Sequence, residues 1–347
     1  MKQELCSMER PLACWKGEER FAGEVLPSLT IILKTGGCRH NRCRMCSYRF
    51  ERYSGDIPLE KLLLSQLEWV VDHYPVAEIA IVKLYTSGSF FDPDEVPPQV
   101  VEQAAKLFRG RLVIAETRPE FVDPARIEAF IAEIDTGAYP TPLFVAIGLE
   151  TTNDAIREKS IDKGFSFSDF KYAVENARKA GAGIKAYLLH KPLFLTEKEA
   201  LADMEQSIRD IAGIADLISM NPCTVQKRTE LEFYWKRGAY RPPYLWSVLA
   251  ALLSAPVPVS CDPLGGGRSR GPHNCGTCDY EIVKAIRDYN LTADRSVLAE
   301  IVERGCECRE EWESVQNPVP RSRNCAFLPV LELRAWTVAI RNLNPDP

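Results

Sequence analysis

Three cysteines lie close together in the sequence Gly36-Gly37-Cys38-Arg39-His40-Asn41-Arg42-Cys43-Arg44-Met45-Cys46. This loop directly follows an apolar, strand-like run at residues 29–34. Three soft thiolates on one short loop can bind three irons of a [4Fe–4S] cluster and leave the fourth iron open to another ligand. The spacing C-x4-C-x2-C after a first strand therefore predicts Cys38, Cys43 and Cys46 as ligands of such a cluster.

A zinc ion is the alternative metal for the same loop. Structural zinc sites have four ligands, usually in two close-spaced pairs. No fourth cysteine lies near this loop, and His40 lies inside it, where reaching the same metal would strain the backbone. The spacing therefore favours an iron–sulfur cluster over zinc.

The composition is that of an ordinary globular protein, with 347 residues, 46% of them hydrophobic and 26% charged. No apolar run approaches the roughly 20 residues that span a bilayer, and the first residues lack the layout of a signal peptide. We therefore expect a cytoplasmic location, where the 12 cysteines indicate metal binding rather than disulfides. The isolated cysteines, predicted to be structural or free thiols, are Cys6, Cys14, Cys223 and Cys325.

The net charge of −5 provides no overall attraction for nucleic acid, but basic residues gather locally. They are Arg39, Arg42, Arg44, Arg49 and Arg52 around the cysteine loop, Arg268 and Arg270 beside a glycine run, and Arg321 and Arg323 near the end. Such a group can contact a phosphate backbone. It can equally offset the negative charge of cluster thiolates, and charge alone does not decide between the two.

The fold class is predicted from apolar, β-rich runs that alternate with helical patterns. The strand-like runs are 29–34, 77–85, 111–116, 143–149, 183–189 and 216–220. Helix signals between them include the N-cap pair Asp123-Pro124 and a capping box that begins at Thr196. Six alternating units predict an α/β fold with a parallel sheet, as a partial, open (βα)6 barrel, in which chemistry lies at the carboxyl ends of the strands. We expect a leader over residues 1–28 that is irregular and packs on the barrel, the barrel over 29–222, and a C-terminal extension over 223–347.

Four further cysteines form two close pairs in the extension, Cys275-x2-Cys278 and Cys306-x-Cys308. Four thiolates in two pairs suit a tetrahedral zinc ion. An auxiliary Fe–S cluster on the same four cysteines, or no metal at all, remains as an alternative. Cys261 is a fifth candidate ligand, and His273 is predicted to make a loop contact instead.

The motifs at the strand ends, taken together with the cysteine loop, resemble the radical S-adenosylmethionine (SAM) superfamily, whose barrel corresponds to residues 29–222. That family more often has three residues between its first two cysteines, whereas this chain has four. The resemblance implies SAM-binding roles for a glycine-containing segment and for three charged residues. They are Ser87, Gly88 and Ser89 for the amino group, Glu116 facing the cofactor, Glu150 for the ribose, and Lys163 for the carboxylate, where relatives have arginine. A plain turn at Ser87–Ser89 and surface salt bridges at Glu116 and Glu150 are the alternatives.

A finer resemblance covers nearly the whole chain. The segments Glu116-Thr117-Arg118-Pro119 and Gly265-Gly266-Gly267-Arg268-Ser269-Arg270-Gly271-Pro272-His273-Asn274-Cys275 resemble the RaSEA family, the archaeal radical SAM enzymes of archaeosine biosynthesis. The second segment is the more specific, because it lies outside the shared barrel.

The RaSEA resemblance implies a lyase that cleaves a C–N bond of a lysine adduct of preQ0 in tRNA to give archaeosine. Its implied partners are tRNA, the lysine-transferring archaeosine synthase and an electron donor, with no membrane. The expected cofactors are SAM, a [4Fe–4S] cluster and a zinc ion on the four C-terminal cysteines, with an auxiliary Fe–S cluster as the alternative to zinc. The sequence does not identify catalytic residues; Lys185, His190 and Lys191 near the fifth strand end are candidate contacts for the lysine moiety, or ordinary polar groups. The alternative functions are another RNA-modifying radical SAM enzyme and a non-catalytic zinc or Fe–S nucleic-acid-binding protein.

Overall fold

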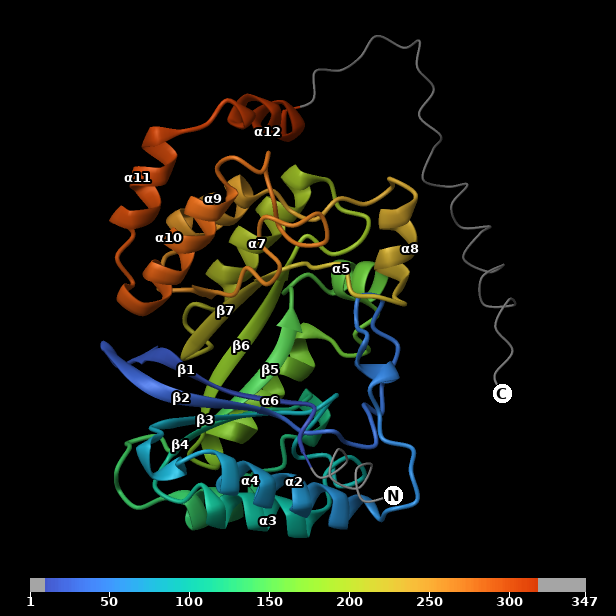
Figure 1. Ribbon diagram of the computed structural model, residues 1–347, viewed down its shortest axis with the longest axis vertical. Coiled ribbons are helices and arrows are strands. Elements are labelled where there is room, and N and C mark those ends of the chain that lie inside the picture. The colour runs from blue at the N-terminus through green and yellow to red at the C-terminus, as the bar shows by residue number, and fades with distance from the viewer. Residues whose placement is uncertain (1–9, 318–347) are drawn as a thin grey trace, which may run out of the picture.

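The structure is a computed structural model that describes residues 10–317, and Figure 1 shows its arrangement. One curled sheet of eight strands follows the chain in order, from β1 to β8. The strands are β1 (Ala13–Phe21), β2 (Glu24–Ile32), β3 (Ile81–Tyr85), β4 (Leu112–Glu116), β5 (Leu143–Glu150), β6 (Gly183–His190), β7 (Leu217–Pro222) and β8 (Ser260–Cys261). All neighbouring pairs from β2 to β8 are parallel, and only β1 and β2 are antiparallel.

Helices connect the parallel strands and cover the outer face of the sheet. They are α2 (Leu59–His73), α3 (Pro98–Leu107), α4 (Pro124–Ile134), α5 (Asp154–Ile156), α6 (Phe167–Lys179), α7 (Glu197–Ile211), α8 (Glu230–Lys236), α9 (Leu245–Ser254), α10 (Asp279–Thr292), α11 (Ser296–Arg304) and α12 (Cys308–Gln316). Short turns of 3-10 helix are η1 (Tyr48–Phe50), η2 (Val76–Glu78) and η3 (Pro119–Phe121), and η4 (Arg157–Ile161) is a π-helical turn. No helix within residues 10–317 is both long enough and apolar enough to cross a membrane.

The predicted (βα)6 core is confirmed, because β2 to β7 correspond to the six apolar runs of the sequence. The main core lies between the sheet and its helices, where side chains such as Leu29, Val113 and Val145 are fully buried. The predicted caps are also present. Asp123 accepts a hydrogen bond from the backbone N–H of Arg126, and Thr196 forms a capping box with Glu199.

The expectation of an irregular leader is wrong for the part that the structure describes. Residues 13–21 form β1, which pairs with β2 through a two-residue turn at Ala22-Gly23. Both turn residues have positive φ, 51° and 90°, as a tight hairpin with right-handed strand twist requires. The strand escaped prediction because it is charged and largely exposed along its middle. Cys6, Cys325, Arg321 and Arg323 lie outside the described residues.

The C-terminal region packs on the barrel at the side where the sheet is open. Helix α10 contacts both β8 and β1, which are the two edge strands of the sheet. A helix therefore bridges the gap that the eight strands leave. Helix α9 packs on α7, and α12 also contacts α7, so the last helices continue the outer layer of the barrel (Figure 1).

Candidate functional site

The cysteine loop starts where β2 ends and crosses the carboxyl ends of the parallel strands. Three contacts fix its path. The guanidinium of Arg39 donates to Asp92 at 2.5 and 3.1 Å, His40 Nε2 lies 2.6 Å from the carbonyl oxygen of Asp162, and the backbone N–H of Arg44 donates to Ile161. The loop is thus tied to segments that follow β3 and β5. His40 uses its Nε2 in this contact, which agrees with leaving it out of the ligand set.

The three loop cysteines are half-buried and do not converge on one point. Burial raises the pKa of the Cys43 thiol, and it raises that of Cys46 to about 11. The Sγ atoms of Cys38, Cys43 and Cys46 do not all lie within 4.8 Å of one another, unlike those of the C-terminal cysteines in the same described range, residues 10–317. Ligands of one zinc ion must converge in that way, whereas thiolates on separate irons of a cluster stand farther apart. The arrangement of Cys38, Cys43 and Cys46 therefore does not match the compact geometry of a single zinc ion.

The glycine of the Ser87–Ser89 segment packs directly against the first loop cysteine. A Cβ atom added at Gly88 would lie 2.7 Å from the Sγ atom of Cys38, which is closer than nonbonded atoms approach. The carboxylate of Glu95 holds this segment in place by accepting hydrogen bonds from the backbone N–H groups of Gly88 and Ser89, at 2.9 and 2.7 Å. It also accepts one from the hydroxyl of Thr35, just before the cysteine loop, at 2.7 Å. One buried carboxylate thus connects the two segments.

The close approach of Gly88 to Cys38 gives a testable prediction. We expect Gly88→Ala to displace the Cys38 thiolate and to lower both bound iron and the rate of reductive SAM cleavage, the latter by at least about tenfold, or about 1.4 kcal/mol of barrier. Iron analysis and quantitation of 5′-deoxyadenosine measure the two effects. Gly213→Ala is the matched control, because a Cβ atom there would meet nothing within 4 Å. A Gly88→Ala protein with normal iron and normal cleavage would contradict the predicted packing.

Two of the charged residues that the sequence singles out form a buried ion pair beside the cysteine loop. Lys163 Nζ lies 2.6 Å from Glu150 Oε1, and the side chains are 14% and 10% exposed. Burial alone would lower the pKa of Lys163, but the Glu150 carboxylate reverses this and holds it above the ordinary value. These charges also act on the Cys43 thiol, so the pair lies close to that cysteine. The alternative of surface salt bridges therefore does not describe Glu150.

The backbone and the neighbouring strand complete this side of the site. Glu150 has a φ of 69°, in the left-handed region that a residue with a side chain rarely occupies, and it follows a register shift in β5. Such strain gathers at functional sites. On β4, burial raises the pKa of Glu116 to about 7, against the opposing charge of Lys163. Carboxylates from two neighbouring strands and one ammonium group thus share the mouth of the barrel.

Sequence reasoning missed two residues that organise this site. Glu95 joins the glycine segment to the start of the cysteine loop, as described above. Arg118 donates through Nη2 to the carbonyl oxygen of Lys163 at 3.0 Å, and its side chain is 7% exposed. Arg118 lies in the quoted motif Glu116-Thr117-Arg118-Pro119, so its position was visible; Glu95 has no comparable sequence signal.

The lysine-contact candidates near β6 separate into two groups. His190 is fully buried, and Lys191 forms an ion pair with Glu197 at 2.5 Å, so both lie within the protein packing. Lys185 instead lines a cavity in the barrel interior. Among the arginines, Arg39, Arg44 and Arg270 are paired with Asp92, Glu230 and Glu232, respectively. These three therefore act partly in holding loops in place.

The four C-terminal cysteines form a compact quartet between the start of α10 and the start of α12. The Sγ atoms of Cys275 and Cys278 are 3.9 Å apart, those of Cys275 and Cys306 3.8 Å, and those of Cys278 and Cys308 3.7 Å. Four sulfurs at about 2.3 Å from one tetrahedral zinc ion would be about 3.8 Å from each other. All four lie within 4.8 Å of one another, and Cys261 is not part of the group. His273 Nδ1 lies 2.7 Å from the carbonyl oxygen of Gly271, the expected loop contact.

Two neutral donors point at the quartet. Trp246 Nε1 donates to the Sγ atom of Cys308 at 3.3 Å, and the Asn274 side-chain amide donates to that of Cys278 at 3.4 Å. Donors of this kind orient metal-bound thiolates and lower their charge density. The geometry of the quartet therefore fits a single metal ion with an ordered surrounding shell.

Comparison with known proteins identifies close relatives. No family model matches the chain. The chain is 39% identical over 317 residues to archaeosine synthase subunit beta of Methanosarcina acetivorans, covering 88% of this chain and 89% of that protein. It is 37% identical over 327 residues to archaeosine synthase subunit beta of Thermococcus kodakarensis, covering 87% and 95%.

Among solved structures, the fold resembles the radical S-adenosylmethionine methyltransferase TsrM of Kitasatospora setae, with cobalamin and a [4Fe-4S] cluster bound. The sequence identity is 13%, the TM-score is 0.42, and the match covers 61% of this chain and 37% of that one.

Proposed function

This chain belongs to the archaeosine synthase subunit beta family, and from this premise we propose that it is a radical SAM lyase that acts on tRNA. The proposed reaction cleaves a C–N bond of the lysine adduct of preQ0 and leaves archaeosine in the tRNA. The observation that carries the proposal is the assembly of four sequence-distant segments at the barrel mouth. The cysteine loop, Gly88, the Glu150–Lys163 pair and Glu116 all gather where the parallel strands end.

The residues of the mouth fit a cluster and SAM. Cys38, Cys43 and Cys46 would hold a [4Fe–4S] cluster, which when bound supplies the electron for reductive cleavage of SAM. Gly88 lets the backbone of its segment approach the Cys38 corner, because any side chain there would collide with the sulfur. That close approach suits a segment that binds the amino group of SAM next to the cluster.

The charged residues would orient the rest of SAM. Lys163 has three N–H donors and uses one on Glu150, so it retains donors for the SAM carboxylate. Its ammonium also keeps Glu150 in position to accept hydrogen bonds from the ribose. Glu116, on the adjacent strand, would add a carboxyl group beside the cationic cofactor, which would favour its ionised form against the burial that raises its pKa to about 7. The buried setting excludes water, which protects a reactive radical from side reactions.

A radical route suits the proposed bond cleavage for a chemical reason. A C–N bond on an aliphatic carbon offers no acidic or basic handle to an ordinary hydrolytic site. Removing a hydrogen atom from a neighbouring carbon makes the bond breakable, and the protein then needs mainly to hold the adduct in the correct place. An electron donor must reduce the cluster. The proposed protein partner is the lysine-transferring archaeosine synthase, a separate chain that makes the adduct.

We propose zinc as the metal of the Cys275/Cys278/Cys306/Cys308 quartet. Sulfur separations of 3.7, 3.8 and 3.9 Å support a single tetrahedral ion, and thiolates of an auxiliary Fe–S cluster would bind different irons and be farther apart. A site with four thiolates and no open position serves structure rather than catalysis.

The proposed reaction is tested with anaerobically reconstituted protein, SAM, dithionite and lysine-adducted preQ0-tRNA, followed by mass spectrometry of the digested nucleosides. We expect archaeosine together with 5′-deoxyadenosine. Deoxyadenosine without archaeosine would retain radical chemistry and indicate another RNA substrate. Neither product, from protein that holds its cluster, would favour a non-catalytic binding protein.

The charge of the chain also predicts how tRNA binds. With a net charge of −5, the isolated chain should bind adducted tRNA at least about tenfold more weakly than its complex with archaeosine synthase, since phosphate contacts dominate such affinities. Filter binding at one fixed salt concentration compares the two. Equal affinities would show that this chain provides its own phosphate contacts.

A further inference from the structure

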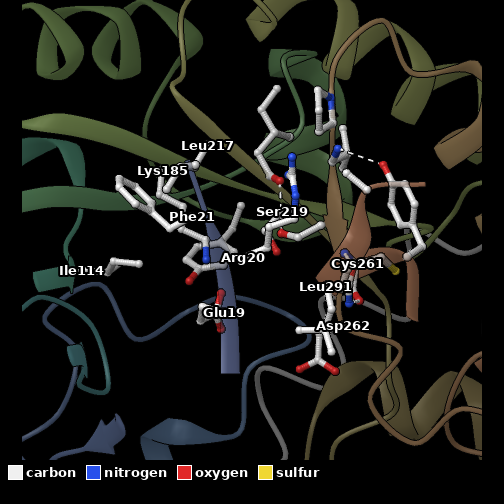
Figure 2. A pocket seen from close by; sticks show the side chains of 18 of the residues that line it. Glu19, Arg20, Phe21, Ile114, Lys185, Leu217, Ser219, Cys261, Asp262 and Leu291 are labelled. Atoms are coloured by element: carbon white, nitrogen blue, oxygen red, sulfur yellow. Dashed lines mark hydrogen bonds between the residues drawn. The ribbon is translucent and has the colours of Figure 1, made fainter. Parts of the chain in front are cut away.

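The interior of the barrel contains a polar cavity on the side away from the cysteine loop. Its volume is about 710 Å³, and it is lined by residues of β1, β3, β6, β7 and α10 (Figure 2). Alternate residues of a strand face the same side, so Lys83 and Tyr85 of β3, and Lys185 and Tyr187 of β6, all project inward. Ionisable groups in the centre of a barrel are costly to bury unless they have partners. The cavity therefore needs an explanation beyond packing.

Two tyrosines separate the cavity from the site at the barrel mouth. The hydroxyl groups of Tyr85 and Tyr187 lie 2.6 Å apart. Tyr85 ends β3 and directly precedes the Thr86-Ser87-Gly88 segment. Burial raises the pKa values of both tyrosines, and the nearby carboxylate of Glu116 raises them further. The upper end of the cavity is therefore adjacent to the proposed SAM site. Lys185 lies two residues deeper than Tyr187, or about 6.6 Å along the strand. This separation is close to the length of one extended lysine side chain, such as that of the adduct.

Lys185 is a buried cation without an anionic partner in direct contact. It is 6% exposed, and among residues 10–317 it has neither a hydrogen bond nor an ion pair within 4.0 Å. Its ammonium lies 5.2 Å from the centre of the Tyr187 ring, a weaker contact than an ion pair. The other cavity lysine differs, because Lys83 forms an ion pair with Glu19. Burial lowers the pKa of Lys185, although Glu19 partly opposes that shift. An anionic ligand group would relieve this unfavourable burial.

Negative charge is available elsewhere in the same cavity. Asp262 follows β8 and lies across the cavity from Lys185 in Figure 2, and within the described part of the chain it has no ion pair. Its side chain is exposed, so water reaches this carboxylate where it borders the cavity. An unpaired cation and an unpaired anion facing one space match a ligand that carries both an anionic and a cationic group.

We propose that this cavity receives the free amino-acid end of the lysine adduct, with Lys185 binding its carboxylate and Asp262 its ammonium group. The inference rests on the proposed function and specifies how its substrate is held. A lysine joined to the base through one nitrogen keeps a second amine and a carboxylate, which form the required pair of charges. With that end anchored below the tyrosine pair, the Tyr85–Tyr187 hydroxyl contact of 2.6 Å would have to open for the carbon chain to continue toward the barrel mouth. Lys185 is then a positioning residue that fixes which carbon lies near the cofactor.

The test compares two adducts in tRNA, one carrying lysine and one carrying lysinamide, which lacks the carboxylate. With wild-type protein we expect kcat/KM for archaeosine formation to be at least about tenfold higher for the lysine adduct, since a charge-assisted hydrogen bond is lost with the amide. In Lys185→Met that preference should fall to about one, mainly through a higher KM for the lysine adduct. Lys185→Arg should retain a preference, because it keeps the positive charge. Lys179→Met, an exposed lysine on α6, should behave as wild type.

Melting temperature and archaeosine formation by the wild type distinguish a structural role of Lys185 from the proposed positioning role. A lysine kept only for structure would lower the melting temperature when replaced, whereas we expect Lys185→Met to be at least as stable as wild type, because an unpaired buried charge is removed. An unchanged lysine-over-lysinamide preference in Lys185→Met overturns the inference while archaeosine formation by the wild type leaves the proposed function intact. Wild-type protein that makes 5′-deoxyadenosine but converts neither adduct would instead reject the proposed function itself.

Discussion

Replacement of Cys43 by alanine should abolish reductive SAM cleavage, with a loss of at least about 10³-fold, because the cofactor carries the difficult step. Cys43 lies beside the Glu150–Lys163 pair and is half-buried. No other cysteine among the described residues joins this loop, so nothing can replace the lost ligand. The expected protein is folded but low in iron and sulfide, and it forms almost no 5′-deoxyadenosine.

Cys14→Ala is the matched control for this experiment. Cys14 lies on β1, is half-buried, and has a thiol whose pKa burial raises to about 11. The control should retain iron, sulfide and cleavage activity close to wild type. A Cys43→Ala protein that kept full iron content and normal 5′-deoxyadenosine formation would remove Cys43 from the ligand set.

Replacement of Cys278 by alanine should cause the largest loss of stability in the chain. Cys278 precedes α10 and belongs to a quartet that joins this helix to the loop before α12. Metal binding at such sites contributes directly to folding free energy, so the loss of several kcal/mol should lower the melting temperature by about 10 °C or more. Calorimetry measures the shift, and hydrogen exchange should show loss of protection first in α10, α11 and α12.

Metal analysis of the same variant distinguishes zinc from an auxiliary cluster. We expect as-purified wild-type protein to contain one zinc per chain, which Cys278→Ala loses while its iron content is unchanged. Cys261→Ala is the control, since Cys261 is buried on β8 and stands outside the quartet. A Cys278→Ala protein that loses iron rather than zinc would establish the auxiliary cluster instead.

The sequence predicted those features whose cause is local. The strands β2 to β7 were found because each is a short apolar run, as expected for parallel strands covered on both faces. The quartet was predicted because Cys275 and Cys278, like Cys306 and Cys308, are too close in sequence to diverge in space. In contrast, β1 is a charged edge strand whose partner, β2, alone gives it regular structure, so its own residues carried little signal.

Features that depend on contacts between distant segments could not be predicted in this way. The hydrogen bonds that Glu95 accepts from both Gly88 and Thr35 require two loops to meet. Lys185 carried a visible signal, a lysine within the apolar run at residues 183–189, but the sequence could not show whether its side chain faced solvent, a partner or a cavity. The SAM-contact assignments of Ser87, Ser89, Glu116 and Lys163 remain predictions that come from the resemblance.

The contact of α10 with both β1 and β8 has a consequence for synthesis of the chain on the ribosome. Strand β1 leaves the exit tunnel early, but the helix that covers its edge begins more than 250 residues later, at Asp279. Until then the hairpin edge has free backbone donors and acceptors, which is the condition for pairing with other nascent chains. The charged middle of β1, with Lys16, Glu18 and Glu19, opposes such pairing while the chain is incomplete. The charged residues of β1 are thus suited to the period of synthesis before α10 covers the edge of this strand, as well as to the finished fold.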